Sequence, residues 1–181
     1  MALLREEFMS SWRDHVIDIH DYPKPGIVFK DITPLLANGP AFGAAIREMA
    51  AFCRNSGLPP DVLACPEARG FIFAAALANE MGIGFIPLRK PNKLPRSTAR
   101  LHFQLEYGED VLEVHRDDVK PGMKILMVDD VLATGGTMAA CVQLLEELGA
   151  QVIGAVFLLE IARLGGRGRL PNFPVGALIQ Q

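Results

Sequence analysis

The sequence predicts an α/β domain with a central, mainly parallel sheet flanked by helices. Three observations lead to this fold class. Short apolar runs alternate with helical patterns between residues 61 and 159, which is the order that right-handed βαβ units produce. The chain has 181 residues, which is enough for one domain with a buried core. Half of the residues are hydrophobic and 22% are charged, a balance typical of globular domains.

The N-terminal part is predicted to contain a helix, a turn, an extended segment and a second helix. Apolar residues recur every three or four positions in Glu6–Ile19, which favours a short amphipathic helix. A proline- and glycine-rich turn follows at Tyr22–Gly26, and Ile27–Lys30 is expected to be extended. The second helix is predicted over Ala41–Asn55.

Strands and helices then alternate from residue 61. The predicted strands are Val62–Cys65, Gly84–Leu88, Lys124–Val128 and Val152–Leu159. The predicted helices are Phe71–Met81, closed by Gly82, and Thr137–Leu148, closed by Gly149. Sheets of this kind bind ligands at the carboxyl ends of their strands, beside the starts of the helices, so we expect function at that edge.

The stretch between residues 90 and 120 interrupts this alternation. It is rich in charge, and Val111–Val114 is its one plausible strand. The run Lys93–Leu105 shows no clear period, and a long stretch without regular structure is often a binding loop or lid. We therefore expect a flexible loop at residues 92–108.

Composition and charge argue against several classes of protein. The net charge of −3 speaks against a protein that coats nucleic acid, because such proteins need a basic field. The longest uncharged runs, Ile32–Ile46 and Val131–Leu145, are interrupted by glycine and fall short of the ~20 apolar residues that span a bilayer. The start of the chain shows no signal peptide. We expect a cytoplasmic protein whose partners include neither nucleic acid nor membrane.

The cysteines and histidines do not form a metal-binding pattern. Cys53, Cys65 and Cys141 are odd in number and lack C-x-x-C spacing, so we expect them to be small buried hydrophobic residues. The four histidines form no pair at helix-face spacing. We therefore expect no metal bound directly by the protein.

The most specific motif is Met127–Thr137, in which an apolar strand leads to Asp129 and Asp130 and then to a loop of small residues. Backbone N–H groups of this loop can surround an anion at the start of a helix. The lysine of a Walker loop and the spacing of a dinucleotide loop are both absent, so we expect a single phosphate. Two carboxylates would repel that phosphate, but they can accept hydrogen bonds from sugar hydroxyls or lie near a metal. A ribose 5-phosphate fits both halves of the motif, whose loop residues are Ala133, Thr134, Gly135, Gly136 and Thr137.

This motif resembles the phosphoribosyl pyrophosphate (PRPP) motif of type I phosphoribosyltransferases. Further segments narrow the resemblance to the adenine phosphoribosyltransferase family, and they occur in the family's order and spacing over almost the whole chain. These segments are Tyr22–Pro34, Glu67–Phe71, Arg89–Pro95 and Leu105–Gly108.

The resemblance implies a fold and a reaction. The fold is the type I phosphoribosyltransferase fold, as a single domain of residues 1–181 with an N-terminal helix and purine-covering hood at residues 1–36 and a flexible catalytic loop at residues 92–108. The reaction converts adenine and PRPP to AMP and pyrophosphate in purine salvage, with Mg²⁺ carried by PRPP. The family also implies a homodimer.

The resemblance also implies roles for individual residues. Glu106 is the expected general acid or base, with Tyr107 beside it in the loop, and Asp129 and Asp130 hold the ribose. Cationic side chains that follow two strand ends would stabilise the departing pyrophosphate. In the family this group corresponds to Arg69, Arg89, Lys90 and Lys93.

Adenine recognition and one backbone feature are likewise implied by the family. Phe29 is expected to stack on the purine, while main-chain groups of Val28 and Lys30 read its edge. Backbone acceptors there would select adenine, whose exocyclic amine donates where hypoxanthine and guanine present a carbonyl. A cis peptide bond is expected between Glu67 and Ala68.

Two other functions remain open from the sequence. The first is a phosphoribosyltransferase for hypoxanthine, guanine or xanthine, which the turnover of each base would distinguish. The second is a regulator that senses PRPP or a purine without catalysis. Such regulators usually carry an attached DNA-binding module, and the roughly 20 residues that precede the hood are too few for a helix-turn-helix domain. The presence of Glu106 and the basic residues also argues for an enzyme.

Overall fold

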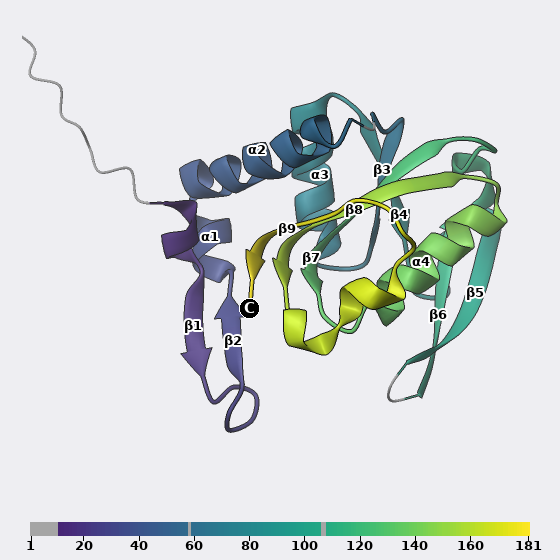
Figure 1. Ribbon diagram of the computed structural model, residues 1–181. Helices are drawn as coiled ribbons and strands as arrows, with labels where there is room; N and C mark the ends of the chain where they lie inside the picture. The colour runs from purple at the N-terminus through teal and green to yellow at the C-terminus, as the bar shows by residue number, and fades with distance from the viewer. Residues whose placement is uncertain (1–10, 58, 106–107) are drawn as a thin grey trace, which may run out of the picture. The chain divides into compact units, whose positions relative to one another are not determined.

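Residues 11–57, 59–105 and 108–181 are described by the computed structural model of the chain (Figure 1). They fall into two units, one that extends to Arg47 and one from Glu48 to Gln181. The boundary lies within helix α2 (Gly39–Asn55), which begins two residues before the predicted Ala41 and ends where the sequence predicts.

The N-terminal unit is built around a two-stranded antiparallel sheet. A 3-10 helix, η1 (Trp12–His15), leads into β1 (Ile17–His20), which pairs with β2 (Val28–Asp31). Helix α1 (Thr33–Ala37), which the sequence analysis did not predict, follows β2.

The expected helix over Glu6–Ile19 is wrong for its last residues, which form β1. Ile17 and Ile19 alternate with Asp18 and His20, so the local pattern has the period of a strand. The proline- and glycine-rich turn then returns the chain onto β2, where backbone pairing stabilises the extended form.

The second unit contains a five-stranded sheet in the order β4-β3-β7-β8-β9, and every neighbouring pair is parallel. This confirms the predicted fold class. The last strand, β9, was not predicted; its Gly176 leaves room for the Phe52 ring, which a Cβ would approach to 2.7 Å. The strands are β3 (Val62–Pro66), β4 (Gly84–Leu88), β7 (Lys124–Leu132), β8 (Gln151–Glu160) and β9 (Val175–Gln180).

Helices cover both faces of this sheet (Figure 1). Helix α4 (Gly136–Glu147) packs into a core cluster that includes Ile125 and Met127 of β7. Because side chains alternate along a strand, the buried Leu126 and Val128 point to the other face. Helix α3 (Gly70–Met81) contacts β3 and β7, and Gly82 in the left-handed conformation ends it as predicted.

The expectation that residues 92–108 lack regular structure is wrong for residues 98–105. They form β5 (Thr98–Leu105), which pairs antiparallel with β6 (Gly108–His115). The burial alternates along β5, with Ala99 buried while Arg100 and His102 are exposed. Ala99 belongs to the core cluster around α4, so one side of the β5–β6 ribbon, the two-stranded antiparallel pair, packs on the core.

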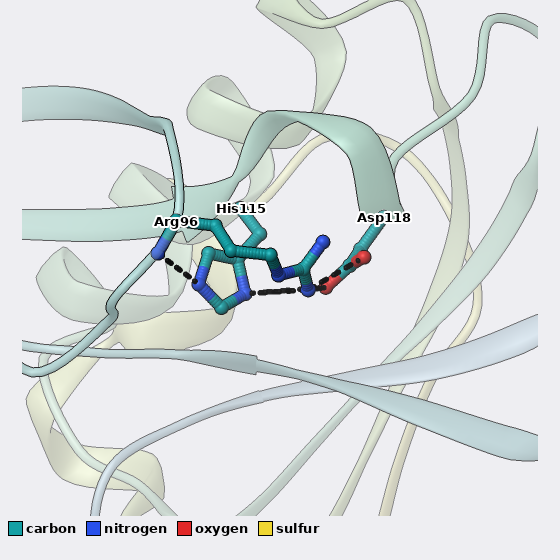
Figure 2. A network of polar contacts seen from close by, with 3 residues as sticks. All are labelled: Arg96, His115 and Asp118. Carbon is teal, nitrogen blue, oxygen red and sulfur yellow. Dashed lines mark hydrogen bonds and ion pairs between the residues drawn. The ribbon is translucent and has the colours of Figure 1, made fainter.

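Two sets of contacts fasten the ribbon at its base. Arg89, next to β4, exchanges two backbone hydrogen bonds of 2.8 Å with Glu113 of β6. Figure 2 shows a polar network in which Nη2 of Arg96 donates to Nδ1 of His115 at 2.9 Å and to Oδ2 of Asp118 at 2.7 Å. This network joins the residues before β5 to 3-10 helix η2 (Arg116–Asp118) after β6.

Two short 3-10 helices connect β8 to β9: η3 (Ala162–Leu164) and η4 (Gly166–Arg169). The second of them lies against the loop that precedes α4. Among the described residues, no helix has the length and apolar character needed to cross a membrane.

Candidate active site

A cavity of about 390 Å³ opens at the carboxyl ends of β3 and β7, beside the starts of α3 and α4. This is the edge at which the sequence predicts ligand binding. Two segments far apart in the sequence line the cavity: residues 66–69, from the last residue of β3 onward, and residues 129–138, from β7 into α4. The structure therefore brings together the acid pair, the small-residue loop and Arg69.

The predicted phosphate loop, residues 133–137, joins β7 to α4 and lines the cavity throughout. Gly135 has a φ of 79° and precedes the first residue of α4, and its carbonyl accepts the N–H of Ala139 at 2.9 Å. The first four N–H groups of a helix have no partner within it, and the helix dipole is positive at this end. The loop can therefore hold an anion with its backbone.

The acid pair lies within β7, which extends to Leu132 rather than ending at Val128 as predicted. Oδ1 of Asp129 accepts the N–H of Asp130 at 2.9 Å, and the Asp130 carboxylate accepts a hydrogen bond from Nε of Arg69. Burial and the adjacent charge of Asp130 raise the pKa of Asp129 well above its usual range. A positive charge that develops beside this pair would therefore be strongly stabilised.

Gly70 at the start of α3 makes room for this acid. A Cβ on Gly70 would lie 2.8 Å from Oδ1 of Asp129, closer than side chains pack. Gly70 belongs to one of the family segments, but its role could not be predicted from the sequence, because the contact joins residues from two separate strand–helix units.

The predicted pyrophosphate ligands are each paired with a carboxylate or close to one. Arg69 contacts Asp130, although 68% of the Arg69 side chain is exposed. Arg89 donates to Glu67, which also lines the cavity. Lys90 forms an ion pair with Asp110 of β6 instead. The positive charge of Lys93 helps to lower the pKa of Glu67.

Glu67, to which the sequence analysis gave no role, is surrounded by positive groups. Its partial burial opposes ionisation, but hydrogen bonds from Arg89 and from the backbone of Lys90, and the charges of Arg89 and Lys93, lower its pKa. The Glu67 carboxylate therefore lies among the positive groups that the sequence predicts to bind pyrophosphate. The peptide bond between Glu67 and Ala68 is cis, which confirms the expected geometry.

The predicted adenine-binding residues lie in the N-terminal unit, on β2. The Phe29 side chain is exposed and packs edge to face on Tyr22, with ring centroids 5.3 Å apart. Nζ of Lys30 lies 2.5 Å from Oδ1 of Asp18, and Val28 pairs with His20. Glu106 and Tyr107 lie outside the described residues.

The cysteines are buried, as the sequence predicts. Burial raises the pKa of Cys53 to about 11, which keeps this thiol protonated. No three side chains of the types His, Cys, Asp and Glu gather closely enough to hold a metal within residues 11–57, 59–105 and 108–181.

Comparison with known proteins gives the family. The phosphoribosyl transferase domain family matches residues 35–171 of the chain. An adenine phosphoribosyltransferase from Dichelobacter nodosus is 66% identical over 93% of this chain and 97% of its own length. The chain belongs to the adenine phosphoribosyltransferases. It is therefore a pentosyltransferase.

Solved adenine phosphoribosyltransferases share its fold. The enzyme from Thermoanaerobacter pseudethanolicus superposes with a TM-score of 0.86 at 45% identity and covers 93% of this chain and 97% of its own. The Saccharomyces cerevisiae enzyme has a TM-score of 0.84 at 32% identity and covers 91% and 94%. That structure is complexed with D-2,5-dideoxy-2,5-imino-altritol 1,6-bisphosphate and adenine.

Proposed function

We propose that the chain performs the family's reaction, in which adenine and PRPP give AMP and pyrophosphate, at the cavity beside β7. One observation carries this proposal: the acid pair, the phosphate loop and Arg69 meet on a single cavity. In this reaction the bond between C1 of the ribose and the pyrophosphate oxygen breaks, and a bond forms from C1 to N9 of adenine. The N9 proton of adenine must leave.

The two halves of the cavity suit the two ends of a ribose 5-phosphate. Backbone N–H groups of residues 133–137 would hold the 5-phosphate at the start of α4. Asp129 and Asp130 would accept hydrogen bonds from the ribose hydroxyls and stabilise the positive charge that develops on the sugar. Residues 66–69 line the cavity next to the acid pair, so the pyrophosphate would lie beside Arg69.

Pyrophosphate binding would require an exchange of partners. Arg69 contacts Asp130, so its move to pyrophosphate would free the Asp130 carboxylate to accept a hydrogen bond from a ribose hydroxyl. Arg89 would likewise leave Glu67. We propose that Lys90 and Lys93 add to this cationic side. One movement of Arg69 thus prepares two parts of the substrate site.

We propose that Mg²⁺ is held by PRPP and not by side chains of the protein. The phosphate and ribose hydroxyl oxygen atoms of PRPP are ligands that Mg²⁺ prefers. When bound with PRPP, the ion supplies neutralisation of the pyrophosphate charge. We propose that it enters with the substrate, whose own oxygen atoms complete its coordination.

We propose that adenine binds to the hood, which lies within residues 1–36 and follows the N-terminal helix, and that Glu106 removes its proton. An exposed Phe29 offers an aromatic face for stacking, and main-chain groups of Val28 and Lys30 can read the purine edge. The carboxylate of Glu106 would take the N9 proton as the new bond forms, with Tyr107 next to it. Closure of the end of the β5–β6 pair, where the chain passes from β5 to β6, would exclude water from the cationic sugar.

We further propose that the enzyme works as a cytoplasmic homodimer in purine salvage and AMP synthesis. The small polar substrates adenine and PRPP support this setting. Size-exclusion chromatography with light scattering measures the assembly directly, and a monomeric mass would overturn the dimer.

A base-specificity assay tests the proposed function. The chain is incubated with PRPP, Mg²⁺ and one base at a time: adenine, hypoxanthine, guanine or xanthine. We expect AMP and pyrophosphate from adenine and far slower turnover of the other three bases. Absence of AMP would support a sensor without catalysis, and preferred turnover of hypoxanthine or guanine would overturn the assignment of adenine.

A further inference from the structure

Backbone atoms of the 3-10 helix η4 pack closely on the backbone of the phosphate loop. A Cβ on Gly166 would lie 2.2 Å from the carbonyl oxygen of Ala133 and 3.0 Å from the backbone nitrogen of Gly135. In the other direction, a Cβ on Gly135 would lie 2.4 Å from the carbonyl oxygen of Gly166. Neither position has room for a side chain, so the two segments touch at both glycines.

Arg167 fixes η4 to the sheet. Its Nε donates to Oε1 of Glu160 at 3.0 Å and its Nη2 to Oε2 at 2.6 Å, which makes a bidentate ion pair. Nη1 of Arg167 donates to the carbonyl of Val175 at 2.6 Å, and Gln180 donates to Oε2 of Glu160 at 3.1 Å. The ion pair therefore joins η4 to the end of β8, and the hydrogen bond to Val175 joins η4 to the start of β9.

Glu160 is well placed for this task because it is the last residue of β8 and is 5% exposed. Hydrogen bonds from Arg167 lower the pKa of Glu160 despite its burial, so the pair stays charged at neutral pH. Glu160 lies beside Leu132 in the sheet, and the following Ile161 donates its N–H to the Leu132 carbonyl at 2.9 Å. Leu132 directly precedes the phosphate loop.

We propose that Gly166 and Arg167 are positioning residues for the 5-phosphate: the ion pair of Arg167 with Glu160 holds Gly166 against the phosphate loop. The proposal rests on the proposed function in one respect, that a ribose 5-phosphate is the ligand of this loop. Backbone donors bind an anion well only when they are held in the right geometry before it arrives. A loop of small residues has little side-chain packing of its own, and η4 supplies the missing support.

Two glycines of the same 3-10 helix provide a matched test. Gly166→Ala forces the loop to move, whereas Gly168→Ala places its Cβ where no atom lies within 4 Å. For Gly166→Ala we expect the KM for PRPP and the Kd for ribose 5-phosphate to rise about tenfold, with kcat and the KM for adenine within about twofold of wild type. Gly168→Ala should match wild type in all four quantities.

Arg167 is tested with a second set of variants. Arg167→Met should raise the Kd for ribose 5-phosphate at least fivefold, Arg167→Lys should recover part of the loss, and Arg163→Met on the exposed surface of η3 should change nothing. Circular dichroism confirms that each protein is folded. If Arg167→Met fails to fold, Gly166→Ala and Arg167→Lys decide the question.

The outcomes separate the positioning proposal from the proposed function. Titration of ribose 5-phosphate needs no turnover, so it reports on the loop even if wild type makes no AMP from adenine. An unchanged affinity in Gly166→Ala, or equal losses for ribose 5-phosphate and for adenine in the variants, would overturn the positioning role. A selective loss for ribose 5-phosphate supports it.

Discussion

The phosphate loop and the cationic side of the cavity are suited to anions in different ways. Residues 133–137 offer backbone N–H groups whose positions are set by the start of α4 and by contact with Gly166. The opposite side offers the guanidinium groups of Arg69 and Arg89, and each already contacts a carboxylate. In the proposed reaction, the first side would bind its anion without losing a protein contact, whereas the second would exchange a protein carboxylate for a substrate phosphate.

This difference suits the two anions in the proposed reaction. The 5-phosphate stays on the product, so a preformed loop serves substrate and product equally. Pyrophosphate must leave, and carboxylates that reclaim Arg69 and Arg89 favour its departure. The pair of Arg69 with Asp130 is exposed on the arginine side but buried on the aspartate side, so its exchange opposes binding unless the substrate gives Asp130 a new hydrogen-bond partner.

The largest expected effect comes from the acid pair, which lies between the two sides. Replacing both Asp129 and Asp130 by Asn keeps their size and removes their charge. We expect kcat to fall by about 100-fold or more, because the cationic sugar loses its electrostatic stabilisation. The Kd for ribose 5-phosphate should stay within about threefold, because the loop binds phosphate through its backbone. A double variant with full kcat would refute the electrostatic role.

A smaller effect is expected at Glu106, which the family resemblance places at the purine. General acid–base help is worth roughly 10²–10⁴-fold, so Glu106→Gln should lower kcat at least tenfold. The Kd for PRPP should change little, since Glu106 is proposed to act on the proton of the purine and not on the anions of PRPP. Glu109→Gln, on the exposed start of β6, is a nearby control. A variant with normal kcat, or with a defect mainly in PRPP binding, would remove Glu106 from the mechanism.

The effect of Asp129 on stability is smaller and has a defined sign. Its pKa is raised in the folded protein above the ordinary value of about 3.9, so the folded state binds more protons than the unfolded state between these two pKa values. Stability therefore falls as pH rises through that window. Asp129→Asn should melt at a higher Tm than wild type at about pH 7.5, with the difference vanishing near pH 4. The exposed Asp117→Asn serves as control, and a lower Tm for Asp129→Asn at neutral pH would contradict the assignment.

The sheet and its helices were predictable because their signals are local. The strand Gly84–Leu88 has its predicted ends, and the helix predicted from Phe71 begins one residue earlier. Strand β5 was missed although Ala99, Leu101 and Phe103 alternate with polar residues. Arginine and histidine on its exposed side made the stretch resemble a charged loop, and its stability as a strand comes from pairing with β6.

The site was predictable where a single segment carries the chemistry. The phosphate loop, the acid pair and Arg69 follow from motifs and line one cavity. The roles of Glu67 and Gly166 depend on Arg89 and on Ala133, which are far from them along the chain. Contacts of this kind arise only when the strands are assembled side by side, so no local pattern reveals them.

The exchange of partners on the cationic side is tested most directly at Glu67. In Glu67→Gln a neutral amide replaces the carboxylate that contacts Arg89, so pyrophosphate no longer competes with a negative charge. Isothermal titration compares the Kd values of magnesium pyrophosphate and of ribose 5-phosphate in wild type and variant. We expect pyrophosphate to bind about three- to tenfold more tightly, a gain of roughly 1 kcal/mol, and ribose 5-phosphate to bind as before. Weaker or unchanged pyrophosphate binding would contradict the account.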